Sequence, residues 1–208
     1  MATAKGPLFS LDASGKVGGA IVFSKWKGRN VIRRHAIPSN PKSAGQVAMR
    51  AMMKFASQIW AGLTTGNKAT WDDLAAASSI SPFNAFVGFN QDQWNHFKSP
   101  TKQLPLTQAG VGGAAPTTTV TAAVKELSLS IADGAPAPAW GWLIHRSTTT
   151  GFTPSRATLI AAIERTATPT VYLDAPLVTG TPYYYRIGGF SADGVKGTLE
   201  AERSGTPT

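Results

Sequence analysis

The three histidines are the first residues to consider for chemistry. His35, His96 and His145 lie far apart, and no HxxxH or HExxH spacing occurs. Those spacings bring two imidazoles to one face of a helix, where they bind zinc. Isolated histidines are far more often surface residues. The histidines therefore give no reason to expect a metal site or a catalytic triad.

Other catalytic patterns are also missing from the sequence. Asp72 and Asp73 are adjacent, so on a helix they point about 100° apart. They are better placed to favour the positive N-terminal end of that helix. The sequence has no GxGxxG, Walker or GxSxG pattern, and with 0 Cys it has neither a disulfide nor a thiolate zinc site. We expect a protein that is not an enzyme and uses no cofactor.

A basic ribbon is the strongest candidate for binding. The stretch GGAIVFSKWKGRNVIRRHAIPSNP, residues 18–41, mixes cations with apolar residues. Its candidate contacts for an anionic partner are Lys25, Lys27, Arg29, Arg33 and Arg34, and its candidate docking residues are Ile21, Phe23, Trp26 and Ile32.

Two kinds of partner suit this ribbon. Cations neutralise the phosphates of a nucleic acid, and Trp26 could stack on a base. A basic arm also binds an acidic protein surface by the same electrostatics. The ribbon carries no signature of a nucleic-acid recognition module, and its β-branched residues favour burial. The sequence favours docking on protein and keeps nucleic acid as the alternative.

Charge is unevenly distributed along the chain. Residues 1–98 hold twelve Lys or Arg against four acids, whereas residues 99–208 hold eight against seven. Such asymmetry suggests that one end meets an anionic partner. No stretch approaches the roughly 20 apolar residues of a membrane span, and the N-terminus lacks the apolar region of a signal peptide. We expect synthesis in a cytoplasm and no membrane partner.

The first 98 residues predict an extended region followed by three short helices. After a flexible lead-in, two β-rich runs flank a turn at Lys27-Gly28. Asn40 or Ser39 with Pro41 predicts a helix start, a second helix is expected from about Thr65 to Ala77, and Ser81-Pro82 opens a third. A unit this small buries little, so we expect some of its apolar residues to complete an interface. The candidates are Met52, Phe55, Trp60, Trp71 and Trp94.

The second half predicts an antiparallel β-sandwich. Residues 99–117 are rich in Pro and Gly and indicate a linker. Beyond it, apolar residues alternate with polar ones in several short runs, among them Val171 with Leu173 and Tyr183 with Tyr185. Residues 157–167 are interpreted as a strand with a flanking loop. The predicted fold is α+β with three parts: a basic arm and helical anchor at 1–98, a linker at 99–117, and a sandwich at 118–208.

The stretch LDAPLVTGTPYYYRIGGFSADGVKG, residues 173–197, resembles the end of a fibronectin type III domain. Leu177, Gly180, Tyr185, Ile187 and Gly194 are among the residues that match the family pattern. The resemblance implies that Tyr183 is a tyrosine-corner residue, whose hydroxyl bonds back to the preceding chain. It departs from the family at KELSLSIADGAP, where the family usually carries a tryptophan.

The N-terminal half is similar to small structural proteins encoded by bacteriophages. The motifs are GKVGGAIVFSKWKGRNVIRR, NPKSAGQVAMR, and LTTGNKATWDDLAAAS with Trp71. The resemblance implies a virion protein that is anchored by its N-terminal half and projects its sandwich, with capsid decoration favoured over a tail position. Its partners would be other virion proteins and copies of itself. The alternative is a DNA-associated protein that uses the basic half.

Overall fold

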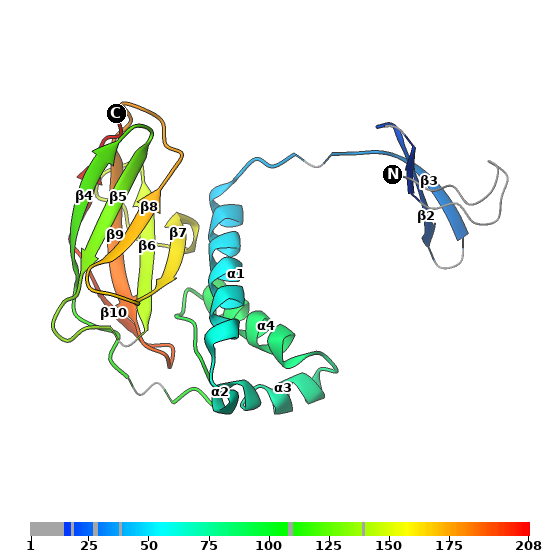
Figure 1. Ribbon diagram of the computed structural model, residues 1–208, viewed down its shortest axis with the longest axis horizontal. Helices are drawn as coiled ribbons and strands as arrows, with labels where there is room; N and C mark the ends of the chain where they lie inside the picture. Colours follow the sequence, from blue (N-terminus) through cyan, green and yellow to red (C-terminus); the bar gives the residue numbers. More distant parts are fainter. Residues whose placement is uncertain (1–14, 18, 27–28, 38, 108–109, 139) are drawn as a thin grey trace. The chain divides into compact units, whose positions relative to one another are not determined.

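Figure 1 shows a computed structural model of the chain, which describes residues 15–17, 19–26, 29–37, 39–107, 110–138 and 140–208. The chain divides into two compact units, Met1–Pro41 and Lys42–Thr208. The boundary therefore lies before the helices and not within residues 99–117, where the composition had placed it. The helices and the sandwich belong to the same unit because they share a core.

The N-terminal unit is a three-stranded antiparallel sheet. Strands β1 (Gly15–Val17), β2 (Ile21–Trp26) and β3 (Arg29–Arg34) lie in that order. In the β2–β3 register, Phe23 faces Ile32 and Ile21 faces Arg34. The predicted hairpin is confirmed, although its turn at Lys27-Gly28 lies outside the described residues. The lead-in was expected to be flexible, yet its residues 15–17 form β1 and pair with β2.

Four helices follow among the described residues: α1 (Ala44–Gly62), α2 (Thr65–Ala69), α3 (Asp72–Ala77) and α4 (Pro82–Asn95). The first begins after Ser43 and not at Pro41, because Lys42 adopts a φ of 50°, outside the helical region. The expected second helix is divided into α2 and α3. The third is confirmed, with the Ser81 side chain accepting a bond from the Asn84 N–H.

The sandwich consists of two antiparallel sheets. One has the order β4 (Thr117–Ala123), β5 (Glu126–Ala132), β8 (Thr170–Asp174). The other has the order β10 (Lys196–Leu199), β9 (Tyr183–Phe190), β6 (Gly141–Ser147), β7 (Leu159–Glu164), and the short β11 (Arg203–Gly205) also pairs with β9. The segment 157–167 thus contains a strand, preceded by the 3-10 turn η1 (Arg156–Thr158). The α+β class with a sandwich is confirmed.

The sheet that contains β6 and β9 is buried on both faces. One face packs inside the sandwich, where Trp142, Ile144, Tyr185 and Ile187 join Leu129 of the opposite sheet. The other face packs against the helices. Buried residues of both layers form one core there. The helical part contributes Met52, Phe55, Trp71, Phe86 and Trp94, and the sheet side contributes Trp140, Leu143, Leu159, Ala162 and Phe190. Trp140 belongs to the core between the helices and the sheet, and Trp142 belongs to the core inside the sandwich.

Phe55 of α1 is the clearest link between helices and sheet. Its ring lies 5.1 Å from that of Trp140 and 5.6 Å from that of Phe190, and the latter two rings are 5.3 Å apart. Aromatic rings at these separations contribute beyond the area they bury. The helices therefore form a third layer of the C-terminal unit.

The segment that connects the helices to β4 is held by hydrogen bonds. The Thr101 N–H donates to the Asn90 side chain at 2.7 Å, and the Lys102 N–H donates to the Ala192 carbonyl at 2.8 Å. Farther on, Gly112 fits so closely that a Cβ there would lie 2.3 Å from the backbone of Lys196. At Gly112, a glycine that suggested a linker instead permits close packing against the sandwich.

Candidate interaction surfaces

The N-terminal sheet exposes apolar and cationic side chains together. Ile21 is 41% exposed and Ile32 is 61% exposed, and their strands place them on the same face as Phe23, which is half-buried. Arg33 and Arg34 are exposed and, as neighbours in a strand, point to opposite faces. The side chains of Lys25, Trp26, Lys27 and Arg29 lie outside the described part of the structure. The described residues thus place Arg34 on the face of the apolar patch and Arg33 on the other face.

The helical residues expected at an interface are mostly internal. Met52, Trp71 and Trp94 are 0% exposed, and Phe55 is 3% exposed. Their apolar surface is covered within the same chain, that of Phe55 by the sheet and that of Trp71 by α4. The expectation that a neighbouring chain covers it is therefore wrong for these four. Trp60 is half-buried, between the rings of Phe83 and Phe86.

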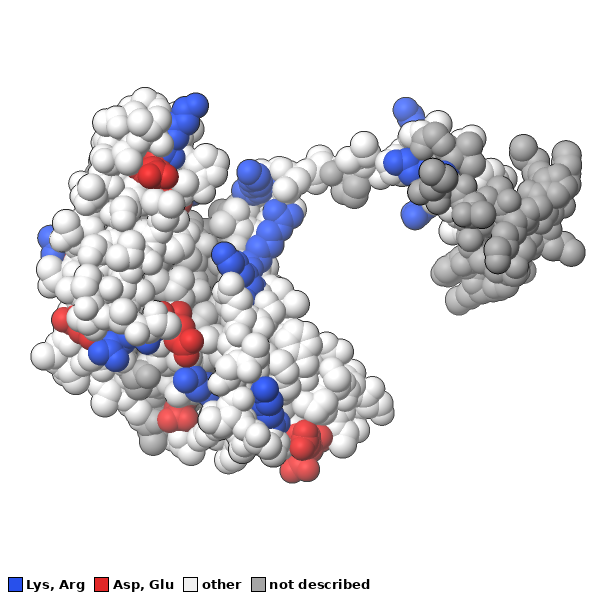
Figure 2. All heavy atoms as spheres, in the orientation of Figure 1, with Lys and Arg blue, Asp and Glu red and all other residues white. Residues whose placement is uncertain are grey.

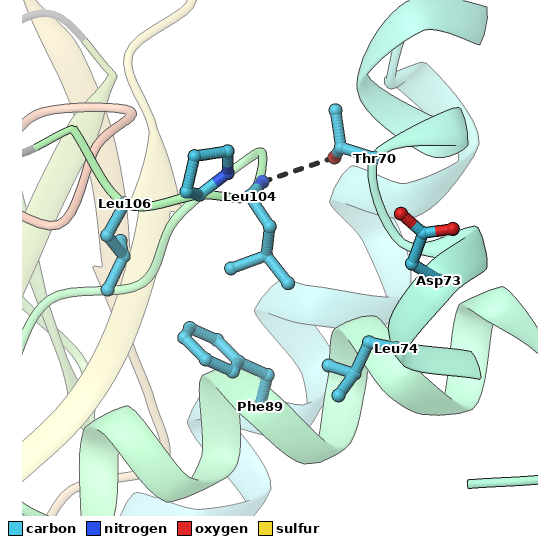
Figure 3. Close-up of a pocket in the computed structure, with 7 residues that line it drawn as sticks. Thr70, Asp73, Leu74, Phe89, Leu104 and Leu106 are labelled. Carbon is cyan, nitrogen blue, oxygen red and sulfur yellow. Dashed lines mark hydrogen bonds between the residues drawn. The ribbon is translucent and has the colours of Figure 1, made fainter. Parts of the chain in front are cut away.

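An open apolar groove of about 700 Å³ lies on the helical layer (Figure 3). Leu74 of α3 and Phe89 of α4 form one side, and Leu104 and Leu106 form the other. The Leu104 N–H donates to the Thr70 hydroxyl at 3.2 Å, which fixes the connecting segment beside the helices. Nothing in the sequence pointed to this groove, because the composition assigned Leu104 to a linker.

His145 is buried where α4 meets the sheet. Its Nδ1 is 3.0 Å from the Thr158 hydroxyl, and its ring lies near those of Trp94 and Phe97. Burial lowers the pKa of His145 to about 4, and the positive charge of Lys196 acts in the same direction. The imidazole is therefore neutral near pH 7.

Lys196 lies at the same junction, in a small cavity of about 80 Å³. Its ammonium donates to the Phe97 carbonyl and lies over the Phe97 ring. Burial lowers its pKa to about 8. The two groups have partners in the fold and form a polar seam between the helical layer and the sandwich.

A second polar cluster joins the two sheets of the sandwich. Both Asp174 oxygens accept from the Arg146 guanidinium at 2.7 Å, and the Tyr185 hydroxyl donates to Asp174 at 2.7 Å. Asp174 is 5% exposed, and Arg146 also lies over the Tyr183 ring. Burial and the neighbouring carboxylate raise the pKa of Tyr172, close by, to about 12. This partly buried ion pair ties β6 to β8 and is structural.

Neither cluster has the arrangement of a metal centre. Among the residues that the structure describes, no group of three or more His, Cys, Asp or Glu is placed to hold a metal ion. Within the same residues, none of the helices has the length and apolar character needed to cross a membrane. The described surfaces that remain as candidates are the N-terminal sheet, the apolar groove and the outer surface of the sandwich.

No protein-family model matches the chain, and no curated protein matches it. Among solved structures, a Fn3-like protein from Clostridium thermocellum is 30% identical, over 45% of this chain and 91% of its own, with a TM-score of 0.34. The FN1–FN3 domains of chicken CNTN1 are 15% identical over 46% of this chain, with a TM-score of 0.36. A β-1,2-glucanase from Parabacteroides distasonis is 16% identical over 50% of this chain, with a TM-score of 0.41. This chain spans only 31% of the chicken chain and 14% of the glucanase.

The tyrosine corner implied by the sequence is present. The Tyr183 hydroxyl accepts a hydrogen bond from the Val178 N–H at 3.1 Å, five residues upstream. This feature marks immunoglobulin-related sandwiches, in which two antiparallel sheets are joined by crossing connections. Here β6 and β7 lie in one sheet, between β5 and β8 of the other along the chain. The C-terminal sandwich of this chain therefore has a fibronectin type III-like fold.

Proposed function

We propose that this chain is a structural, non-enzymatic component of a bacteriophage particle. In this proposal the N-terminal sheet anchors the chain to another virion protein, and the unit of residues 42–208 projects. Decoration of the capsid is favoured over a tail position, because a small anchored module with a projecting sandwich suits a repeated lattice. The support for a phage origin is the similarity of the N-terminal motifs to phage structural proteins.

The observation that carries the docking role is the exposure of Ile21 and Ile32 on a small basic sheet. Burial of apolar surface contributes about 25 cal/mol for each Å² removed from water. Residues 1–41 also hold seven of the 20 Lys and Arg but only one of the 11 acids. An apolar patch on a sheet this rich in cations is suited to an acidic protein surface that has its own apolar centre.

The helices no longer contribute to the anchor. Their large apolar side chains are buried within the C-terminal unit. The proposed anchor is therefore the N-terminal sheet alone and not the whole of residues 1–98, as the sequence had suggested. Because the sheet and residues 42–208 are separate compact units, docking of the sheet leaves the core of the projecting unit unchanged.

The alternative is a DNA-associated protein, supported by the exposed Arg33 and Arg34. The two functions predict opposite orders of sensitivity. Phosphate binding depends on cations and weakens steeply as salt rises. Apolar docking depends on Ile32 and tolerates salt.

The test compares three variants of the intact chain for binding to the phage particles and to a DNA duplex. Ile32→Asp should abolish particle binding, whereas Gln at Lys25, Lys27, Arg29, Arg33 and Arg34 should weaken it modestly. Ile37→Asp is the matched control, because Ile37 is 82% exposed and follows β3. Tight DNA binding at physiological salt that is lost in the Gln variant would refute docking and support the alternative.

A further inference from the structure

Strand β8 forms an open edge of the sandwich. It is the last strand in the order β4-β5-β8 and pairs with β5 on one side. No strand among the described residues pairs with its other side. The backbone N–H and C=O groups along such an edge are a template for another strand.

Over its five residues, Thr170–Asp174, the edge carries no lysine, proline or bulge, although Pro169 precedes it and Pro176 lies two residues after it. β8 reads TVYLD, and its register with β5 is unbroken from Thr170 to Asp174. Natural edges are normally protected by charges, prolines or bulges. Its one charged residue, Asp174, is buried against Arg146 and Tyr185.

The outer face of this sheet carries exposed apolar side chains beside the edge. Val171 is 62% exposed and Leu173 is 54% exposed, although alternating apolar residues usually mark the buried face of a strand. Thr170, Tyr172 and Asp174 point inward instead, and the neighbours of Val171 and Leu173 on β5 are Ser130 and Ser128. In Figure 2 the surface over β4, β5 and β8 is largely free of charge between its two ends.

We propose that β8 pairs in antiparallel fashion with β8 of a second copy of this chain, across a two-fold axis. Symmetric dimers use the same patch on both subunits, and a two-fold axis sets identical strands antiparallel. Pairing joins the two β4-β5-β8 sheets into one continuous sheet. Val171 and Leu173 of both copies then lie on its outer face.

A second copy suits this edge better than a charged partner does. The strand offers no accessible charge, so an acidic or basic surface gains nothing from it. Residues 99–208, which include the sandwich, hold eight Lys or Arg against seven acids, so little net charge opposes the approach of a second copy there. The uncharged edge is a place where two copies can approach. This inference goes beyond the proposed function and does not depend on the partner of the N-terminal sheet.

The test is sedimentation velocity of the full chain over a range of concentrations. Val171→Lys should raise the dimer dissociation constant by about tenfold or more, because a lysine at the edge blocks strand pairing. Val178→Lys is the matched control: Val178 is 65% exposed but lies in the turn after β8, so dimerisation should not change. A parent chain that stays monomeric, or equal dissociation constants for the two variants, would overturn the proposal.

Cysteine cross-linking gives an independent measurement, since the chain has 0 Cys. With a short bismaleimide, Leu173→Cys should yield a covalent dimer and Val178→Cys should not. Equal cross-linking of the two would reject the β8 pairing. Ile32→Asp should leave this dimer unchanged, and raised salt should not dissociate it. An Ile32→Asp chain that loses particle binding but keeps the dimer therefore shows that the anchor and the β8 pairing are independent.

Discussion

The N-terminal sheet and the helix α1 both carry large apolar side chains. Those of α1 that face the sandwich are buried within their own unit, whereas Ile21 and Ile32 of the sheet are exposed. Phe55 of α1 is 3% exposed because Trp140 and Phe190 of the sheet lie against it. Ile32 of β3 is 61% exposed, on a sheet of three strands. A second layer, rather than the number of apolar residues, decides whether such a surface is core or a docking site.

The largest effect is expected when an apolar side chain of each region is shortened to Ala. Phe55→Ala should lower the free energy of unfolding of the C-terminal unit by about 3–5 kcal/mol, because it leaves a cavity between helix and sheet. Ile32→Ala removes an exposed side chain and should change stability by less than about 0.5 kcal/mol. Urea unfolding followed by tryptophan fluorescence measures both. Similar losses for the two variants would remove the distinction between core and docking surface.

The junction of helices and sheet should also be sensitive to acid through His145. Its pKa in the folded chain is lowered from 6.5 to about 4, so between these values the unfolded state binds a proton that the folded state does not. The proton uptake lowers the free energy of unfolding. The loss is absent above pH 6.5 and grows as pH falls, reaching about 3 kcal/mol near pH 4.

Unfolding titrations at pH 7 and pH 4.5 test that dependence. His145→Gln should lose less stability between the two pH values than the parent chain does. The control is His96→Gln, since the imidazole of His96 is exposed on the outside of the helical layer. An unaltered pH dependence in His145→Gln would mean that the junction does not hold a neutral imidazole.

The smallest effect is expected within the sandwich itself. Tyr183→Phe removes the hydroxyl that accepts from the Val178 N–H and should lower stability by about 1 kcal/mol. Thermal unfolding of the two chains measures this change. Tyr184→Phe, one residue along β9 and only partly buried, is the control and should be close to neutral. A larger loss in Tyr184→Phe would show that the corner hydrogen bond is not the source of the effect.

Local signals predicted the elements well. The alternation in β5 and β9, the Ser81-Pro82 helix start and the Tyr183 corner depend on residues close together in the sequence, and all are confirmed. The start of α1 was misplaced because Lys42 takes a left-handed conformation that its residue type does not suggest.

The errors concern contacts between distant segments. Nothing in the sequence around Phe55 shows that it meets Trp140 and Phe190. The glycines of residues 99–117 have the composition of a linker, but at Gly112 the missing side chain permits close packing. Val171 and Leu173 alternate as core residues do, yet the inward positions of β8 belong to Tyr172 and Asp174, which bond or pack within the sandwich. Period-two patterning predicts two faces without telling which of them is inside.

Native-state hydrogen exchange of the full chain tests the central claim most directly, because it reports the opening free energy of each segment. If α1 and the sandwich share one core, amides at Met52 and Phe55 should open with the same free energy as those of Tyr185 and Ile187 in β9. Amides of β2 and β3 should open with a lower one. Protection of α1 that matches the N-terminal sheet and falls well below β9 would contradict the account.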